Sequence, residues 1–314
     1  MHRFSEIQEV LMKAVQIKGH VAAGSANVIW GLMAPVAKLV MAAGLVSPLL
    51  MGGFRIYGAA LLFWLASMFM PDEHVSGKDY FMLAGAALLG IVFNQGCYLF
   101  GVSYTSPGEA SIITTTMPIW VMLLAAVLLK EPITFLKVAG IVLGALGALI
   151  LVVGGNGAKA DSGDNPMLGD FLVLTAQLSY ALYLTFYRNF IRKYSVITLM
   201  KWMFTFAAIA ITPWIIPEAS GTQWNLFGWK EIGGISYVVV FATFLAYVCI
   251  MTAQKKLRPT LVGMYNYLQP ITATCIGICL GLEHFTMFKV LAVILIFAGV
   301  SLVTLSKARS SDVA

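Results

Sequence analysis

Ten long apolar stretches constrain this chain more than any other feature of its sequence. A helix that crosses the hydrocarbon core of a bilayer needs about 20 predominantly apolar residues. In lipid, every backbone N–H and C=O group must be paired within the protein, and a helix does this within one segment. The sequence therefore predicts an all-α membrane protein with ten transmembrane helices, near residues 19–44, 47–70, 79–100, 106–129, 132–154, 168–188, 195–216, 231–253, 258–281 and 284–305.

Composition supports this class and argues against others. Hydrophobic residues make up 60% of the chain and charged residues 11%, whereas a soluble domain carries about 25% charged residues. The net charge of +6 does not indicate nucleic acid, because the basic residues lie in short loops between apolar stretches. The four cysteines lie inside apolar stretches, and no histidine or second cysteine pair completes a zinc site. We therefore expect a lipid bilayer as surroundings, no nucleic-acid partner, no metal and no cofactor.

The longest polar separator divides the chain. Residues 155–167 are rich in Gly, Asp, Asn and Ser and are typical of a flexible linker. They separate a five-helix unit at 19–154 from a second at 168–306, with tails at 1–18 and 307–314. Phe4, Ile7, Leu11 and Val15 share one helical stripe, so the first tail could be a short helix lying at the membrane surface. A frayed tail is the alternative.

The distribution of Lys and Arg predicts the orientation, because loops on the cytoplasmic side carry an excess of both. With the N-terminus inside, fourteen of the 20 basic residues fall in inner loops and tails. The outer loops hold Lys159, Lys230 and Lys289, and the spans hold Lys38, Arg55 and Lys201. Both termini are therefore expected in the cytoplasm. Short loops favour a bacterial plasma membrane.

An internal repeat relates the two units. A shift of 152 residues superimposes Pro107 on Pro259, Pro118 on Pro270, Glu131 on Glu283, Lys137 on Lys289 and Gly147 on Gly299, without a gap. Because each unit has an odd number of spans, the copies must insert in opposite orientations. Inverted repeats suit alternating access, in which one copy rocks against the other around a site near the middle of the membrane.

The segment from Tyr104 to Pro118, with Glu131-Pro132 after the fourth span, resembles the EamA repeat of the drug/metabolite transporter superfamily. Trp30-Gly31, Ser47-Pro48 and Arg55 fit the same pattern, and the resemblance covers about residues 20–306. It implies a ten-helix fold, a central cavity between the repeats, and export of amino acids or related metabolites. In the second copy, no Arg matches Arg55, which puts a shared role for that residue in doubt.

Polar and aromatic residues within the spans are candidates for the substrate path, since such side chains tend to face the protein interior or a wet cavity. Several share helical stripes, and rings with amides suit a small amphipathic solute. Hydrogen bonding between helices is the alternative use of the same groups. Tyr187 and Gln254 lie near the ends of their spans and are the weakest members of the stripes. The candidates are Asn27, Trp30, Lys38, Arg55, Asn94, Gln95, Tyr98, Tyr180, Tyr183, Thr243, Tyr247, Tyr265 and Gln269.

The charged residues of the spans leave two interpretations open. Lys38, Arg55 and Lys201 could snorkel to the membrane surface. Alternatively, Arg55 or Lys38 attracts a substrate carboxylate on the outer side. All Asp and Glu residues fall in loops, tails or span ends, which predicts a facilitator or exchanger rather than a carboxylate-based proton antiporter. Glu109, at the start of the fourth span, is the one carboxylate that could overturn the prediction of a facilitator or exchanger.

The function expected from these features is export or facilitated transport of amino acids or related small metabolites. A nucleotide-sugar or sugar-phosphate exchanger is the alternative. A membrane-embedded enzyme is a further one, but the chain has no HExxH, GxSxG or phosphate-loop motif and no paired carboxylates within the spans. GxxxG pairs at Gly140 and Gly144 and at Gly277 and Gly281 permit close helix packing, within a monomer or across a homodimer.

Overall fold

The computed structural model describes residues 2–41, 44–105, 107–154, 165–279 and 285–306, and these residues form helices and turns with no strand. The helices of the first half are α1 (His2–Met41), α2 (Pro48–Ser67), α3 (Gly77–Ala87), the π-helix η1 (Leu88–Phe93), α4 (Asn94–Tyr104), α5 (Pro107–Thr114), α6 (Met117–Leu128) and α7 (Phe135–Gly154). The second half contains α8 (Pro166–Phe186), α9 (Arg188–Ile191), α10 (Val196–Gly221), the short 3-10 helix η3 (Trp224–Leu226), α11 (Trp229–Val239), the π-helix η4 (Val240–Leu245), α12 (Ala246–Lys256), α13 (Pro259–Met264), the 3-10 helix η5 (Tyr265–Tyr267), α14 (Leu268–Cys279) and α15 (Met287–Leu305).

Helix starts follow the local sequence. Ser47 and Ser195 precede α2 and α10, and each side-chain oxygen accepts a hydrogen bond from the backbone N–H three residues later. Asn165 does the same for α8. These caps satisfy N–H groups that the first turn of a helix leaves unpaired. Pro48 and Pro166 follow two of the caps, at a position where a missing N–H costs nothing.

Within the described residues, seven helical segments are long and apolar enough to cross a membrane. Their outward faces carry large apolar side chains; Phe135 and Trp229 are 86% and 89% exposed. A soluble protein rarely exposes apolar surface on this scale. The segments are Pro48–Ser67, Gly77–Val102, Phe135–Val153, Pro166–Phe186, Val196–Gly221, Trp229–Lys256 and Met287–Leu305. The chain is thus an all-helical, multi-pass membrane protein.

The predicted spans at 106–129 and 258–281 are wrong as single helices, because each is interrupted. Thr115 and Thr116 form a turn between α5 and α6, and η5 separates α13 from α14. Pro118 and Pro270 lie shortly after these interruptions. Proline has no N–H for the bond to the carbonyl four residues back, and its ring crowds that carbonyl, so a helix is weakened there.

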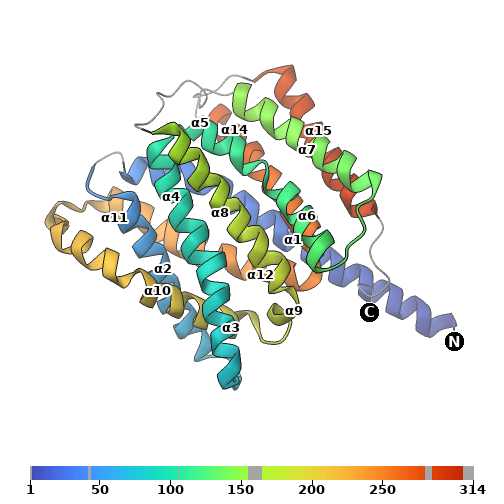
Figure 1. Cartoon of the computed structure of the whole chain (residues 1–314), viewed down its shortest axis with the longest axis horizontal. Coiled ribbons are helices and arrows are strands. Elements are labelled where there is room, and N and C mark those ends of the chain that lie inside the picture. The colour runs from blue at the N-terminus through green and yellow to red at the C-terminus, as the bar shows by residue number, and fades with distance from the viewer. Residues whose placement is uncertain (1, 42–43, 106, 155–164, 280–284, 307–314) are drawn as a thin grey trace.

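The N-terminal segment also differs from the prediction. α1 runs without interruption from His2 to Met41, so residues 3–17 form neither a separate helix nor a frayed tail. At about 1.5 Å per residue its 40 residues span about 60 Å, twice the thickness of a hydrocarbon core. The N-terminal part of α1 projects beyond the bundle in Figure 1.

The offset of 152 residues found in the sequence recurs in the structure. The π-helices η1 and η4 start at Leu88 and Val240 and end at Phe93 and Leu245, so they are 152 residues apart at both ends. The helix breaks near Thr115 and Tyr267 have the same separation. Such agreement in irregular backbone indicates duplicated halves.

Helix packing pairs the two halves (Figure 1). α7 packs along α15, α2 along α10, α4 along α8, and α1 along α12. Gly140 of α7 permits the close approach to α15, because a Cβ at Gly140 would lie 2.6 Å from the Gly299 carbonyl oxygen. Gly144 makes room for η5, since a Cβ there would lie 2.5 Å from the Tyr267 ring. This GxxxG pair is therefore used inside the bundle. Gly281 lies outside the described residues, as does the side-chain environment of Gly277.

Candidate functional site

Each of the two π-helices opens the helix backbone near the middle of a membrane-spanning segment. A π-helix shifts the hydrogen-bond pattern by one residue, and such bulges often occur at functional sites. The Ala242 carbonyl of η4 accepts a hydrogen bond from Trp30 Nε1 (2.9 Å), and the Leu89 carbonyl of η1 accepts one from Ser179 Oγ (2.8 Å). α1 and α8 are thereby fastened to the irregular parts of the opposite half.

A polar network lies directly after these π-helices. Gln95 Nε2 donates to the Tyr247 hydroxyl at 2.7 Å, and the two residues are 152 positions apart. Each is therefore the counterpart of the other in the repeat, and a bond between counterparts marks the axis that relates the halves. The indole of Trp30 meets the Tyr247 ring edge-on, with 5.8 Å between ring centroids. We call Trp30, Arg55, Gln95, Tyr98, Tyr180, Tyr183, Thr243, Tyr247 and Gln254 the central network.

Arg55 enters this network from α2. Its Nε donates to Thr243 Oγ1 at 3.2 Å, and the residue is only 7% exposed. Thr243 lies halfway along the Trp229–Lys256 span, and its hydroxyl donates in turn to the Val238 carbonyl. The phenol groups of Tyr98 and Tyr247 are close enough to Arg55 to interact with it electrostatically. Arg55 is thus drawn inward, which is contrary to the snorkelling interpretation.

Tyrosines of α8 extend the network toward the end of α12. Gln254 Nε2 donates to the Tyr180 hydroxyl (3.3 Å), and the Tyr183 hydroxyl donates to Gln254 Oε1 (3.2 Å). The Tyr183 oxygen also lies 3.1 Å from Met251 Sδ. Its position near a span end made Gln254 one of the weakest candidates in the sequence. In the structure it is buried and bridges two tyrosines. This burial depends on side chains of α8 that reach α12, and the sequence of a single helix does not show which side chains will meet it.

The remaining candidates lie elsewhere. Gln269 Nε2 donates to Asn27 Oδ1 (2.9 Å) and to Asn266 Oδ1 (3.1 Å), which joins α1 to the α13–α14 segment. Tyr265 lies beside these amides, with its hydroxyl 2.7 Å from His20 Nδ1. Asn94 Nδ2 donates to the Ala176 carbonyl and so connects α4 to α8. This is the alternative use of the candidate residues, hydrogen bonding between helices.

Lys38 belongs to α1, but its side chain lies outside the described residues.

The structure contains a buried ionic cluster that the sequence did not predict. Glu131 Oε2 accepts from Lys137 Nζ at 2.8 Å and from Thr260 Oγ1 at 3.1 Å, and Arg188 lies 3.8 Å from Oε1. Glu131 and Lys137 are 3% and 1% exposed. The repeat pairs both residues with counterparts in the second half, but their place between apolar stretches does not indicate that they are buried. The Glu131 cluster (Glu131, Lys137, Arg188 and Thr260) joins the α6–α7 turn to α9 and α13 of the other half.

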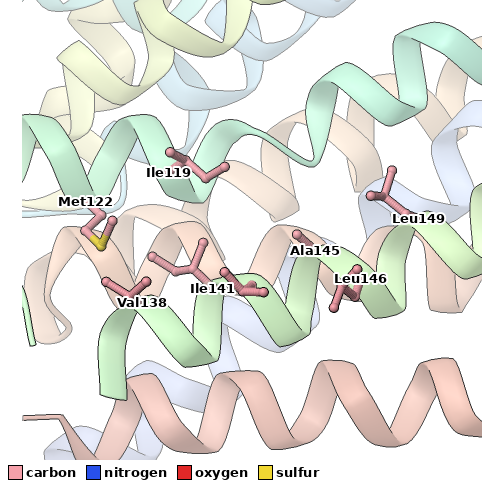
Figure 2. A pocket seen from close by; sticks show the side chains of 8 residues that line it. Ile119, Met122, Val138, Ile141, Ala145, Leu146 and Leu149 are labelled. Atoms are coloured by element: carbon pink, nitrogen blue, oxygen red, sulfur yellow. The ribbon is translucent and has the colours of Figure 1, made fainter. Parts of the chain in front are cut away.

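A cavity of about 260 Å³ lies apart from these groups (Figure 2). Apolar side chains of α6 and α7 line it, among them Ile119, Met122 and Ile141. It offers a solute no hydrogen-bonding group, so it is not a candidate for the recognition of a polar metabolite.

The fold and the central network define a polytopic membrane protein built from two similar bundles that meet at a polar and aromatic centre. The model of the EamA-like transporter family matches residues 17–153 and again residues 167–305. The chain belongs to this family, which confirms the resemblance seen in the sequence. It is therefore a membrane transporter and not an enzyme.

Relatives with similar sequences are transporters of unspecified substrate. An uncharacterized transporter of Bacillus subtilis, YetK, is 24% identical over 305 residues, which cover 96% of this chain and 91% of YetK. An uncharacterized transporter of Archaeoglobus fulgidus is 25% identical over 274 residues, which cover 87% of this chain and 94% of that protein. A solved crystal structure with 16% identity superposes with a TM-score of 0.76 over 93% of this chain and 97% of its own, which shows a shared fold.

Proposed function

We propose that this chain exports or facilitates the movement of amino acids or related small metabolites by alternating access, with the central network as the substrate site. The observation that carries the proposal is the hydrogen bond between Gln95 and Tyr247. A group that bonds to its own repeat counterpart lies on the axis between the halves. A site on that axis can face either compartment when one half rocks against the other.

The repeat geometry extends beyond this pair. The Tyr267 hydroxyl donates to the Thr115 carbonyl at 3.1 Å, again across 152 residues. The carbonyl of Ala292 lies against Gly147, and the carbonyl of Gly140 lies against Gly299, so the same contact occurs twice with the halves exchanged. This reciprocity is what a two-fold axis produces. It supports ten spans in two inverted five-helix repeats, at 19–154 and 168–306, joined by the linker 155–167.

Polar contacts join two turns at one end of the bundle. Asp79 bonds to Lys193 and Tyr194, and Glu73 accepts from the Ser195 backbone, so the α2–α3 turn is tied to the α9–α10 turn. The Glu131 cluster lies at turns that the excess of Lys and Arg places on the cytoplasmic side. We therefore assign this end to the cytoplasm, with both termini there, in the plasma membrane of a bacterium.

Counterflow in proteoliposomes tests the proposed function. Purified protein is reconstituted and preloaded in turn with unlabelled amino acids, hydroxy acids, nucleosides and sugar phosphates, and uptake of the labelled solute is followed. Accelerated exchange of an amino acid or a related acid supports the proposal. Exchange of sugar phosphates alone would contradict it in favour of the exchanger alternative.

A further inference from the structure

Arg55 is a buried cation with no acidic partner in the part of the chain that the structure describes. The residue is 7% exposed, and its Nε donates a hydrogen bond to the neutral hydroxyl of Thr243. No carboxylate in the described part of the chain pairs with its guanidinium. A guanidinium presents five N–H groups in a planar fork that matches a carboxylate, and a charge taken out of water needs a partner of opposite sign. Among the described residues, no carboxylate therefore balances the charge at the terminal edge of the fork.

A second incomplete group lies close to it. Gln95 gives its Nε2 to Tyr247, whereas its Oε1 is buried and has no hydrogen-bond partner among the described residues. Buried polar atoms are nearly always paired, so an acceptor left without a partner among the described residues is suited to a donor on a bound solute. Tyr247 lies near both groups, since it bonds to Gln95 and is close enough to Arg55 to interact with it electrostatically.

We propose that Arg55 binds the carboxylate of the transported solute and that Gln95 Oε1 accepts a hydrogen bond from an N–H or O–H group on the same solute. The inference rests on the proposed function and specifies its substrate class. That class is a small organic monocarboxylate with a donor near the acid group, such as a hydroxy acid or an amino acid.

The charge of the network selects this class. Arg55 is its one cation within the described residues, which matches a single negative charge but not the two charges of a phosphate ester. No Asp or Glu side chain of the described network could balance a net positive solute. The rings of Trp30, Tyr180 and Tyr247 offer apolar area for the body of the solute. A structural role would instead have given the guanidinium an acidic or carbonyl partner inside the protein.

Thermal unfolding of the purified chain in detergent tests the binding step. The probes are 3-phenyllactate, 3-phenylpropionate (which lacks the donor), phenethylamine and glycerol 3-phosphate. We expect 3-phenyllactate to raise the melting temperature of the wild type most, 3-phenylpropionate less, and the other two not at all. Arg55→Gln should weaken the apparent affinity for 3-phenyllactate by about tenfold or more, as expected for losing a charged hydrogen bond.

Two variants separate recognition from folding. Without a ligand, Arg55→Gln should melt at the wild-type temperature or above it, because it removes an unpaired buried charge. Lys201→Gln removes another intramembrane cation, one that lies over the ring of Trp64 at 4.7 Å, and should bind 3-phenyllactate as the wild type does. Unchanged affinity in Arg55→Gln, no stabilisation of the wild type by either carboxylate, or greater stabilisation by phenethylamine or glycerol 3-phosphate would overturn the inference.

Counterflow separates this inference from the proposed function. If the wild type binds 3-phenyllactate through Arg55 but exchanges no solute, the binding site stands and the transport mechanism fails. If the wild type exchanges amino acids while Arg55→Gln exchanges them equally well, the transport mechanism stands and the assignment of Arg55 fails.

Discussion

Tyr247 connects the separate parts of the central network at the scale of single residues. Its hydroxyl accepts from Gln95, and its ring is held between Trp30 and Phe204, both edge-on, at 5.8 and 5.0 Å. The residue is 6% exposed. A tyrosine fixed on two sides by aromatic rings presents its hydroxyl in a defined position, as recognition of a small solute requires.

We predict that Tyr247→Phe impairs both stability and transport. The change leaves the buried amide of Gln95 without its acceptor, which should cost about 1–3 kcal/mol. Unfolding by denaturant in detergent measures the first effect and counterflow the second. Tyr57→Phe is the matched control, because Tyr57 bonds to Thr212 at an exposed position outside the network. Equal behaviour of the two variants would contradict the role assigned to Tyr247.

Glu73 gives the chain a pH-dependent contact. The carboxylate is partly desolvated, which raises its pKa, but hydrogen bonds from Ser195 and Thr198 outweigh this and lower the pKa below the ordinary value. A group with a lowered folded-state pKa stabilises the fold above its unfolded pKa, about 4.3, and this stabilisation is lost as pH falls through the folded pKa.

The melting temperature of Glu73→Gln should therefore lie below that of the wild type at pH 6. The difference should correspond to about 0.5 kcal/mol, the size of a partly screened charge at the start of α10. It should shrink as pH falls below about 4.3. Melting curves of both proteins between pH 6 and 3 check this, and a difference that does not change with pH would refute it.

At the scale of helices, the Glu131 cluster holds together the ends of elements from both halves. Breaking a buried ion pair by removing one partner leaves a bare charge and costs about 3–5 kcal/mol. Lys137→Met should therefore destabilise the chain strongly, because it leaves Glu131 with the more distant Arg188 and with Thr260. Thr260→Val should cost far less. Thermal unfolding compares the two, and similar small losses in both would show that the cluster does not hold the helices.

The close contact between α7 and α15 can be tested by comparing two Gly→Ala variants for their effect on stability. Gly140→Ala places a methyl group 2.6 Å from the Gly299 carbonyl oxygen, where backbone must move, so we expect a loss of about 1–3 kcal/mol. Gly96→Ala adds the same group to α4 where no atom lies within 4 Å. It should be neutral or slightly stabilising, since Ala is the better helix former. Destabilisation of equal size at both positions would contradict this packing.

The helices themselves were largely predictable from apolar length, and their interruptions were not. Pro118 and Pro270 were visible in the sequence, but a proline can kink a transmembrane helix as readily as break it. The π-helices leave no such mark. They are stabilised by Trp30 and Ser179, which approach from α1 and α8 and bond to the opened carbonyls. Interactions between distant segments therefore decide the backbone of the site.

At the scale of the whole molecule, the repeat was the most informative sequence signal. It predicted duplicated halves, and the 152-residue offset reappears in η1 and η4, elements that the sequence did not suggest. The composition of the centre was also predictable, because polar groups in spans gather inside. The hydrogen bonds within the centre were not predictable. Asn94 and Gln95 are neighbours in the sequence, yet Asn94 bonds to the backbone of α8, whereas Gln95 bonds to Tyr247 at the axis between the halves.

Alternating access requires that the central network be reachable from both sides of the membrane. The most direct test uses a chain in which Cys97, Cys249, Cys275 and Cys279 are replaced and Tyr98→Cys is introduced. A membrane-impermeant maleimide is then applied to right-side-out and to inverted vesicles. We predict labelling of position 98 in both preparations, slowed by a transported solute. Labelling in only one preparation, or in neither, would contradict alternating access at this site.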